Sequence, residues 1–226
     1  MTPQELDARI IADSRDRVDW LRARARGITA TDVAGLSGES SIARAADAKL
    51  GRGPHFRGNA YTDHGRRREP EIAAWVAATH GILPSSALFR SEHEPRHLAT
   101  PDGVRLDGEG RVLLAEIKTT NKSWRTIPRT YLRQVWWQQY VLGAERTLFV
   151  WEEHVDFQPV HDEPRCVWID RDEKQIRRLV GLADRLIDEL YHRTTGKEPP
   201  HRGPVAPRSR TSLRERDMFR ALALTD

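Results

Sequence analysis

The stretch TPDGVRLDGEGRVLLAEIKTT, residues 100–120, contains the pattern that decides the fold. Its apolar run at 112–117 is typical of a central strand, and the turn-forming residues at 107–110 predict a tight hairpin just before that strand. The stretch therefore predicts two strands that fold back on each other, with charged residues close to the open end of the pair.

Three charged side chains are expected to converge at that end. Residues two apart on a strand point to the same face, so Glu116 and Lys118 project together while Ile117 faces the core. The hairpin folds Asp102 back beside Glu116. An acid and a lysine at this spacing could also form an ordinary surface ion pair, worth roughly 0–1 kcal/mol. We prefer a functional site, because isolated charges are costly at the end of an apolar strand.

These residue types match those that bind a hard divalent cation. Mg²⁺ takes oxygen ligands and keeps several waters, so the carboxylates of Asp102 and Glu116 and the backbone carbonyl of Ile117 suit it, with Mn²⁺ as the alternative. Such a cation polarises a phosphodiester and lowers the pKa of a bound water. Lys118 is expected to orient that water and offset negative charge in the transition state rather than to abstract a proton.

Composition sets the outer limits. A chain of 226 residues is long enough for one domain with a sizeable core, and its 31% charged residues predict a highly polar surface. The net charge of +4 says little about partners. The single cysteine, Cys166, excludes an internal disulfide and a four-cysteine iron–sulfur site, and it fits a cytoplasmic location. No stretch approaches the roughly 18 apolar residues of a membrane span, so no membrane association is expected.

Periodicity and end signals predict an α/β fold with a central mixed β-sheet flanked by helices. The main helices are expected at 4–24, from 65–69 to 81, at 129–142 and at 171–193. Strands are expected within 87–118, at 146–151 and at 165–170. Residues 1–197 are predicted to form a single domain, followed at 198–226 by a Pro-rich linker and a short C-terminal helix that starts with a capping box at Ser212.

Pro101-Asp102-Gly103 followed by Glu116-Ile117-Lys118 resembles the signature of the PD-(D/E)XK nuclease superfamily. This resemblance implies a restriction-endonuclease-like core. More of the chain, over about residues 18–190, is similar to one branch, the lambda-exonuclease-like, YqaJ-type viral recombinase family. Five elements carry this likeness in the correct order: Trp20 to Thr31, which ends in Gly27-Ile28-Thr29-Ala30-Thr31, then Gly65 to Glu69, Thr100 to Val104 together with Glu116-Ile117-Lys118, Tyr131-Leu132-Arg133-Gln134-Val135, and Ile169 to Lys174.

The resemblance implies catalytic roles for five side chains. Asp102 and Glu116 match the metal ligands, and Lys118 matches the catalytic lysine. Glu69 matches a helix glutamate that completes the metal site directly or through water. The alternative role for Glu69 is that of an acid in the first turn of a helix, where it complements the helix dipole. Gln134 matches a glutamine that positions the nucleophile or the metal's waters, and its alternative is an ordinary polar residue on a helix face.

The N-terminal element implies a DNA-binding role. Counted back from Ile28 without gaps, Arg24 aligns with an arginine that binds the 5′-terminal phosphate in exonucleases of this type. Arg22 or Arg26 could serve instead, because the spacing from Trp20 differs by one residue. Thr29 and Thr31 could donate hydrogen bonds to the same phosphate. Their alternative role is helix capping, which is compatible with phosphate binding.

The family implies a Mg²⁺-dependent deoxyribonuclease, a 5′→3′ exonuclease that acts on double-stranded DNA ends in phage-type homologous recombination or repair. It also implies a single-strand-annealing protein as partner and a homo-oligomer. Two alternatives remain. One is a structure- or sequence-selective endonuclease on the same fold, and the other is a DNA-end-binding module that does not cleave. The second is disfavoured, because all the core catalytic residue types are present.

Overall fold

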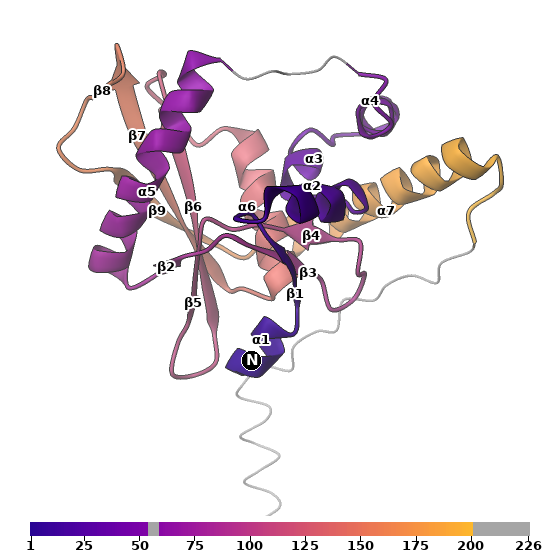
Figure 1. Ribbon diagram of the computed structural model, residues 1–226, viewed down its shortest axis with the longest axis horizontal. Coiled ribbons are helices and arrows are strands. Elements are labelled where there is room, and N and C mark those ends of the chain that lie inside the picture. The colour runs from indigo at the N-terminus through magenta and orange to yellow at the C-terminus, as the bar shows by residue number, and fades with distance from the viewer. Residues whose placement is uncertain (54–58, 201–226) are drawn as a thin grey trace, which may run out of the picture.

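The computed structural model describes residues 1–53 and 59–200 (Figure 1). Its helices are α1 (Pro3–Asp7), α2 (Arg17–Ala25), α3 (Ala30–Ala34), α4 (Glu39–Lys49), α5 (Ala60–His80), α6 (Arg129–Leu142) and α7 (Glu173–Thr195). Its strands are β1 (Ile10–Asp13), β2 (Leu83–Pro84), β3 (Ala87–Arg90), β4 (Leu98–Ala99), β5 (Gly103–Leu106), β6 (Val112–Thr120), β7 (Arg146–Val155), β8 (Gln158–Pro159) and β9 (Arg165–Asp170).

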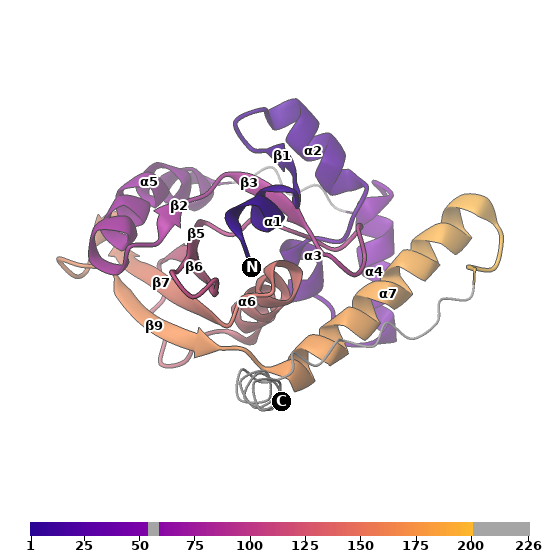
Figure 2. The same ribbon diagram turned by 90° about the horizontal axis from the view of Figure 1, so that it is seen from below.

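The main sheet has the order β2-β5-β6-β7-β8, and β9 also pairs with β7. It is mixed, because β6 and β7 run parallel while β5–β6 and β7–β9 run antiparallel. A second, three-stranded sheet has the order β1-β3-β4. Helix α5 lies on one side of the main sheet and α6 on the other, with α7 beyond α6 (Figure 2). The predicted α/β fold with a central mixed sheet flanked by helices is confirmed.

The alternation of β6 explains how both faces of the sheet are covered. Ala115 and Ile117 pack with Ile72 and Val76 of α5 in one core cluster. Leu114 lies on the opposite face and packs in the larger cluster that includes residues of α6 and α7. The predicted hairpin between β5 and β6 is confirmed, and its register pairs 103 with 115 through to 106 with 112.

The predicted helix at 4–24 is wrong. The chain there forms α1, then β1, then α2. Strand β1 pairs with β3, so that Ile10 lies opposite Phe89. The Asp16 side chain accepts a hydrogen bond from the Asp19 amide and starts α2 as a new helix. Pairing with a distant strand therefore overrides the local helical periodicity of this segment.

Helix α5 begins earlier than predicted. Asn59 caps it by accepting a hydrogen bond from the Thr62 amide, so Pro70 stands inside the helix and not in its first turn. Glu69 consequently lies in the third turn, and stabilisation by the helix N-terminus no longer explains it. Near its start the helix approaches β6 closely: a Cβ atom at Gly65 would lie 2.7 Å from the Thr119 hydroxyl oxygen.

The other predicted elements agree closely with the structure. The predicted bounds 129–142 and 165–170 are those of α6 and β9, the predicted strand at 146–151 continues to 155, and α7 is shifted by two residues. The predicted linker lies within the described residues only as far as 200, and the predicted capping box at Ser212 lies outside them. None of the described helices combines the length and apolar character needed to cross a membrane.

Leu114 tests the burial of the central strand. It is 0% exposed between the sheet and α6, so Leu114→Ala should lower the free energy of unfolding by about 2–5 kcal/mol through lost contacts and a residual cavity. The matched variant Leu83→Ala removes the same atoms from a side chain that is 65% exposed. It should change the free energy of unfolding by less than about 0.5 kcal/mol. Urea denaturation of both variants measures the difference; equal losses would contradict the packing.

Candidate active site

Asp102 is held against strand β6 by main-chain hydrogen bonds. Its amide donates to the carbonyl of Ala115 at 3.1 Å, and its carbonyl accepts from the amide of Ser85 at 3.0 Å. Its Oδ2 accepts a hydrogen bond from the amide of Ile117 at 2.6 Å. The carboxylate of Asp102 therefore lies at the level of β6 that carries Glu116 and Lys118.

Glu116 is a buried carboxylate with both oxygens engaged. Its side chain is 4% exposed, and its Oε1 forms an ion pair with the ammonium group of Lys118. Its Oε2 accepts a hydrogen bond from Nε2 of Gln138 at 2.7 Å. A buried carboxylate is costly without such partners, so Lys118 and Gln138 together make this position of Glu116 tolerable.

Glu69 approaches the pair from α5. It lines a cavity of about 400 Å³ together with Ile117 and Lys118. Burial raises the pKa of the Glu69 carboxyl, the charge of Lys118 opposes the rise and the charge of Glu116 adds to it. The predicted convergence of Asp102, Glu116 and Lys118 is therefore present, and the carboxyl group of Glu69 joins them from α5.

The charges of the cluster are unbalanced. Burial raises the pKa of Asp102 well above its usual value, and the neighbouring charge of Glu116 raises it further. Burial alone would lower the pKa of Lys118, but Glu116 and Asp102 outweigh this and raise it above its usual value. The raised pKa keeps Lys118 protonated, so that its ammonium group can donate hydrogen bonds and offset negative charge. Three carboxyl groups thus face one ammonium group.

The cluster suits Mg²⁺ better than a cation that needs a closed cage. Within residues 1–53 and 59–200, no three His, Cys, Asp or Glu side chains are arranged so that they alone could hold a metal ion. Mg²⁺ is commonly bound by one or two carboxylates, several waters and the phosphate of a substrate. Asp102 and Glu116 fit that mode, and Glu69 fits a contact through water.

Gln138 is the residue that the sequence analysis missed. The predicted glutamine, Gln134, is half-buried on α6, and no hydrogen bond joins it to the cluster within the part of the chain that the structure describes. Gln138 lies one turn further along the same helix face, is 2% exposed, and contacts Glu116 directly. Its position four residues after Gln134 was the available signal.

The N-terminal candidates occupy a separate region. The Arg24 guanidinium lies over the ring of Trp20, 4.3 Å from its centroid. Thr29 is buried and caps α3, and its hydroxyl donates to Asp32 at 2.8 Å; Thr31 is exposed in the first turn of that helix. Within the described ranges, no hydrogen bond or ion pair joins Arg24, Thr29 or Thr31 to the Asp102 cluster.

The alternative arginines differ from Arg24 in their surroundings. Arg22 is exposed and forms an ion pair with Asp19, and Arg26 is exposed at the C-cap of α2. Arg24 is half-buried, and burial lowers the pKa of its guanidinium while the charge of Asp32 opposes this. Arg24 is therefore the most enclosed of the three.

The chain is similar to known proteins in sequence and in fold. The family model for the YqaJ-like viral recombinase domain matches residues 19–145. LHK-Exo, an alkaline exonuclease from Laribacter hongkongensis solved in complex with dAMP, is 24% identical with a TM-score of 0.62, over 78% of this chain and 93% of that chain. A phage related exonuclease from Haemophilus somnus 129PT is 16% identical with a TM-score of 0.53, over 75% of this chain and 96% of that chain. No curated protein matches the chain. The likeness to these structures shows the fold.

Asp102 should make the free energy of unfolding depend on pH. A carboxyl whose pKa is raised by folding contributes stability below its usual pKa, and this is lost as the pH rises through the raised value. Asp102→Asn removes the titrating group and keeps its shape. In the presence of a chelator, the variant should be about 0.5–2 kcal/mol more stable than the parent at pH 8, and the difference should shrink towards pH 4.

Asp107 provides a control, because folding shifts its pKa in the opposite direction and its contribution to stability has the opposite pH dependence. Hydrogen bonds from the amide and then the side chain of Arg111 lower the pKa of its carboxyl. Its contribution is therefore present above the usual pKa and lost on acidification, so Asp107→Asn should be less stable than the parent at pH 8. Urea denaturation at several pH values compares the two variants. A loss of stability in Asp102→Asn at pH 8 would contradict the charge imbalance.

Proposed function

The chain belongs to the family of YqaJ-like viral recombinase domains, and on this basis we propose that it is a Mg²⁺-dependent deoxyribonuclease of phage-type recombination or repair. The observation that carries the proposal is the hydrogen bond from the Ile117 amide to Asp102, which brings that carboxylate to the level of Glu116 and Lys118. Two carboxylates and an ammonium group arranged around one bound cation can promote the hydrolysis of a phosphodiester.

Asp102 and Glu116 would hold the cation, together with the backbone carbonyl of Ile117, and Glu69 would complete the site directly or through water. When bound, Mg²⁺, or Mn²⁺ in its place, supplies polarisation of the scissile phosphodiester and a lowered pKa for the attacking water. The excess of carboxylates over ammonium groups supports this assignment. Burial and then the charge of Glu116 raise the pKa of Asp102, and a divalent cation would relieve the second of these effects.

The protein's own groups would orient the reactants. Lys118, kept protonated by Glu116 and Asp102, would donate to the attacking water or to the phosphate and offset negative charge as it develops. Gln138 would hold the second oxygen of Glu116 and so fix the direction of the first. Gln134, one turn away, keeps its proposed role in positioning the nucleophile.

The direction of cleavage rests on the N-terminal region. We assign binding of a 5′-terminal phosphate to Arg24, with Thr31 as a further donor, and this assignment implies 5′→3′ degradation from double-stranded ends. The buried hydroxyl of Thr29 is already used in the cap of α3. The exonucleases of similar fold support cleavage from ends over internal cleavage. A single-strand-annealing partner and a homo-oligomer remain proposals that follow from the family.

Digestion of a linear duplex and of the same sequence as a closed circle tests the activity. With Mg²⁺ the parent should release nucleotides from the linear form only, and a chelator should stop the release. Lys118→Ala should reduce the rate by about 10²–10³-fold, as expected for a lost transition-state donor. Lys174→Ala, a change to an exposed lysine at the start of α7, should leave the rate unchanged. An undiminished rate in Lys118→Ala would reject the assigned chemistry, and cleavage of the circle would favour the endonuclease.

Linear duplexes with and without a 5′ phosphate, labelled at each end, test the direction. The parent should prefer the phosphorylated 5′ end by about 10-fold or more, because the guanidinium forms charge-assisted hydrogen bonds with the phosphate. Arg24→Ala should lose this preference, whereas Arg26→Ala should retain it. The reverse result would move the assignment to Arg26, and equal attack on both strand polarities would contradict end binding altogether.

A further inference from the structure

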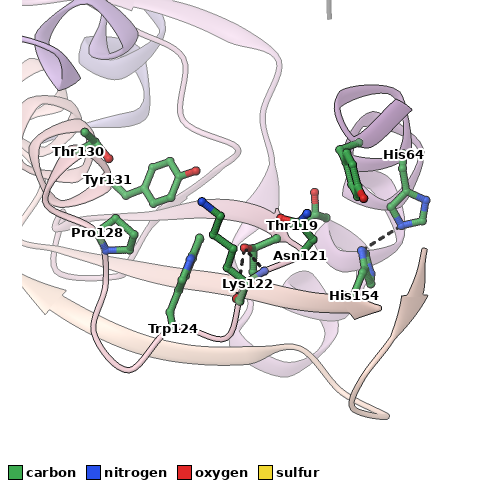
Figure 3. Close-up of a pocket in the computed structure, with 11 residues that line it drawn as sticks. His64, Thr119, Asn121, Lys122, Trp124, Pro128, Thr130, Tyr131 and His154 are labelled. Carbon is green, nitrogen blue, oxygen red and sulfur yellow. Dashed lines mark hydrogen bonds between the residues drawn. The ribbon is translucent and has the colours of Figure 1, made fainter. Parts of the chain in front are cut away.

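A second cavity, whose lining residues are drawn in Figure 3, shares lining residues with the cavity of the carboxylate cluster. Its volume is about 300 Å³, and it lies between the start of α5, the segment after β6 and the start of α6. Tyr61 and Thr119 line both this cavity and the one that contains Glu69 and Lys118. The two cavities are therefore neighbours across Thr119. A DNA strand bound at the cluster would continue into the second cavity.

One wall of the second cavity is aromatic and firmly supported. The rings of Trp124 and Tyr131 have centroids 5.3 Å apart at an interplanar angle of 47°. Trp124 also packs on Phe149 and Trp151, with distances between ring centroids of 6.3 Å and 6.5 Å. The ammonium group of Lys118 lies 5.6 Å from the centre of the Tyr131 ring. This wall thus joins an apolar platform directly to the cation of the cluster.

The segment after β6 supplies polar groups. The Lys122 amide donates to the Thr120 hydroxyl oxygen at 3.0 Å, and that hydroxyl donates to the Lys122 carbonyl at 3.3 Å, which closes a tight turn. Asn121, within this turn, also lines the cavity. Among the described residues that line it, none carries a carboxylate. An anionic group beside Lys122 would therefore meet attraction without opposing charge.

The rim opposite the aromatic wall is held by a chain of hydrogen bonds. His64 Nε2 lies 3.0 Å from His154 Nδ1, and His154 Nε2 lies 2.7 Å from Glu152 Oε1. Arg68 donates two hydrogen bonds of 2.9 Å to the carboxylate of Glu152. The negative charge of Glu152 is thus neutralised behind the rim, and the two imidazole rings that line the cavity are held against each other by a hydrogen bond (Figure 3).

We propose that this cavity is a mononucleotide subsite: the aromatic wall stacks on the base next to the cleaved phosphodiester, and Lys122 with the neighbouring hydroxyls binds its sugar–phosphate. Its volume is at the lower end for small-molecule pockets and suits one nucleotide, not a duplex. Stacking does not distinguish bases strongly, because every base has a π-face, so the subsite would accept all four nucleotides. This inference rests on the proposed function and names the part of the substrate that the second cavity holds.

Calorimetric titration of the full chain in Mg²⁺ with dGMP, deoxyribose 5-phosphate and inorganic phosphate tests the subsite without cleavage. The parent should bind dGMP about 5–150-fold more tightly than deoxyribose 5-phosphate, the ratio that stacking of one base provides. Trp124→Leu should abolish this ratio. Trp168→Leu, a matched change on β9 outside the cavity, should retain it.

Lys122→Ala provides a second variant that does not disturb the packed wall, since Lys122 is exposed. It should weaken dGMP and deoxyribose 5-phosphate by the same factor, about 3-fold or more, and leave their ratio unchanged. The subsite is overturned if the parent shows no preference for the base, if folded Trp124→Leu keeps the preference, or if Lys122→Ala binds both ligands as the parent does.

The cleavage assay separates this inference from the proposed function. Lys118→Ala should lose cleavage yet keep the preference for dGMP, because it leaves the aromatic wall in place. A parent that cleaves DNA but shows no base preference overturns the subsite alone. A parent that shows the preference but cleaves no DNA overturns the proposed nuclease and leaves the nucleotide pocket standing.

Discussion

The hydrogen bond from the Ile117 amide to the Asp102 carboxylate, at 2.6 Å, is the contact on which the rest of the arrangement depends. It forms only in the register that pairs Gly103 with Ala115. A slip of one residue would turn Glu116 and Lys118 to the opposite face of the sheet, towards α5. The pairing that completes the hairpin therefore also brings the charged groups together, and fold and site share one structural cause.

The hairpin, α6 and β9 could be predicted from the sequence because their signals are local: turn residues, an apolar run and regular periodicity. The convergence at Asp102 follows from the same local rules. The N-terminal segment could not be predicted, because β1 exists only through its pairing with β3, nearly eighty residues away. The start of α5 was misplaced because Pro70 suggests a first turn, whereas the cap at Asn59 sets the helix start ten residues earlier.

Residues that act through tertiary contacts were harder to find. A helix sequence shows that Gln134 and Gln138 share one face, but it does not show which of them reaches the strand beneath; the packing of α6 on the sheet decides this in favour of Gln138. The aromatic wall likewise combines Trp124, from an irregular segment, with Tyr131 from a helix. No periodicity relates two such positions, so only the folded chain brings them together.

Gly65 shows how a defect could arise without loss of any charged or hydrogen-bonding group. Any larger residue there would press on the Thr119 hydroxyl, which lies between the two cavities. Either α5 would move outward, carrying Glu69 with it, or Thr119 would rotate into one cavity. A genetic screen scored by activity would then recover substitutions at this glycine, which lines the cavity of Glu69 and Lys118 but contributes no side chain of its own to the chemistry.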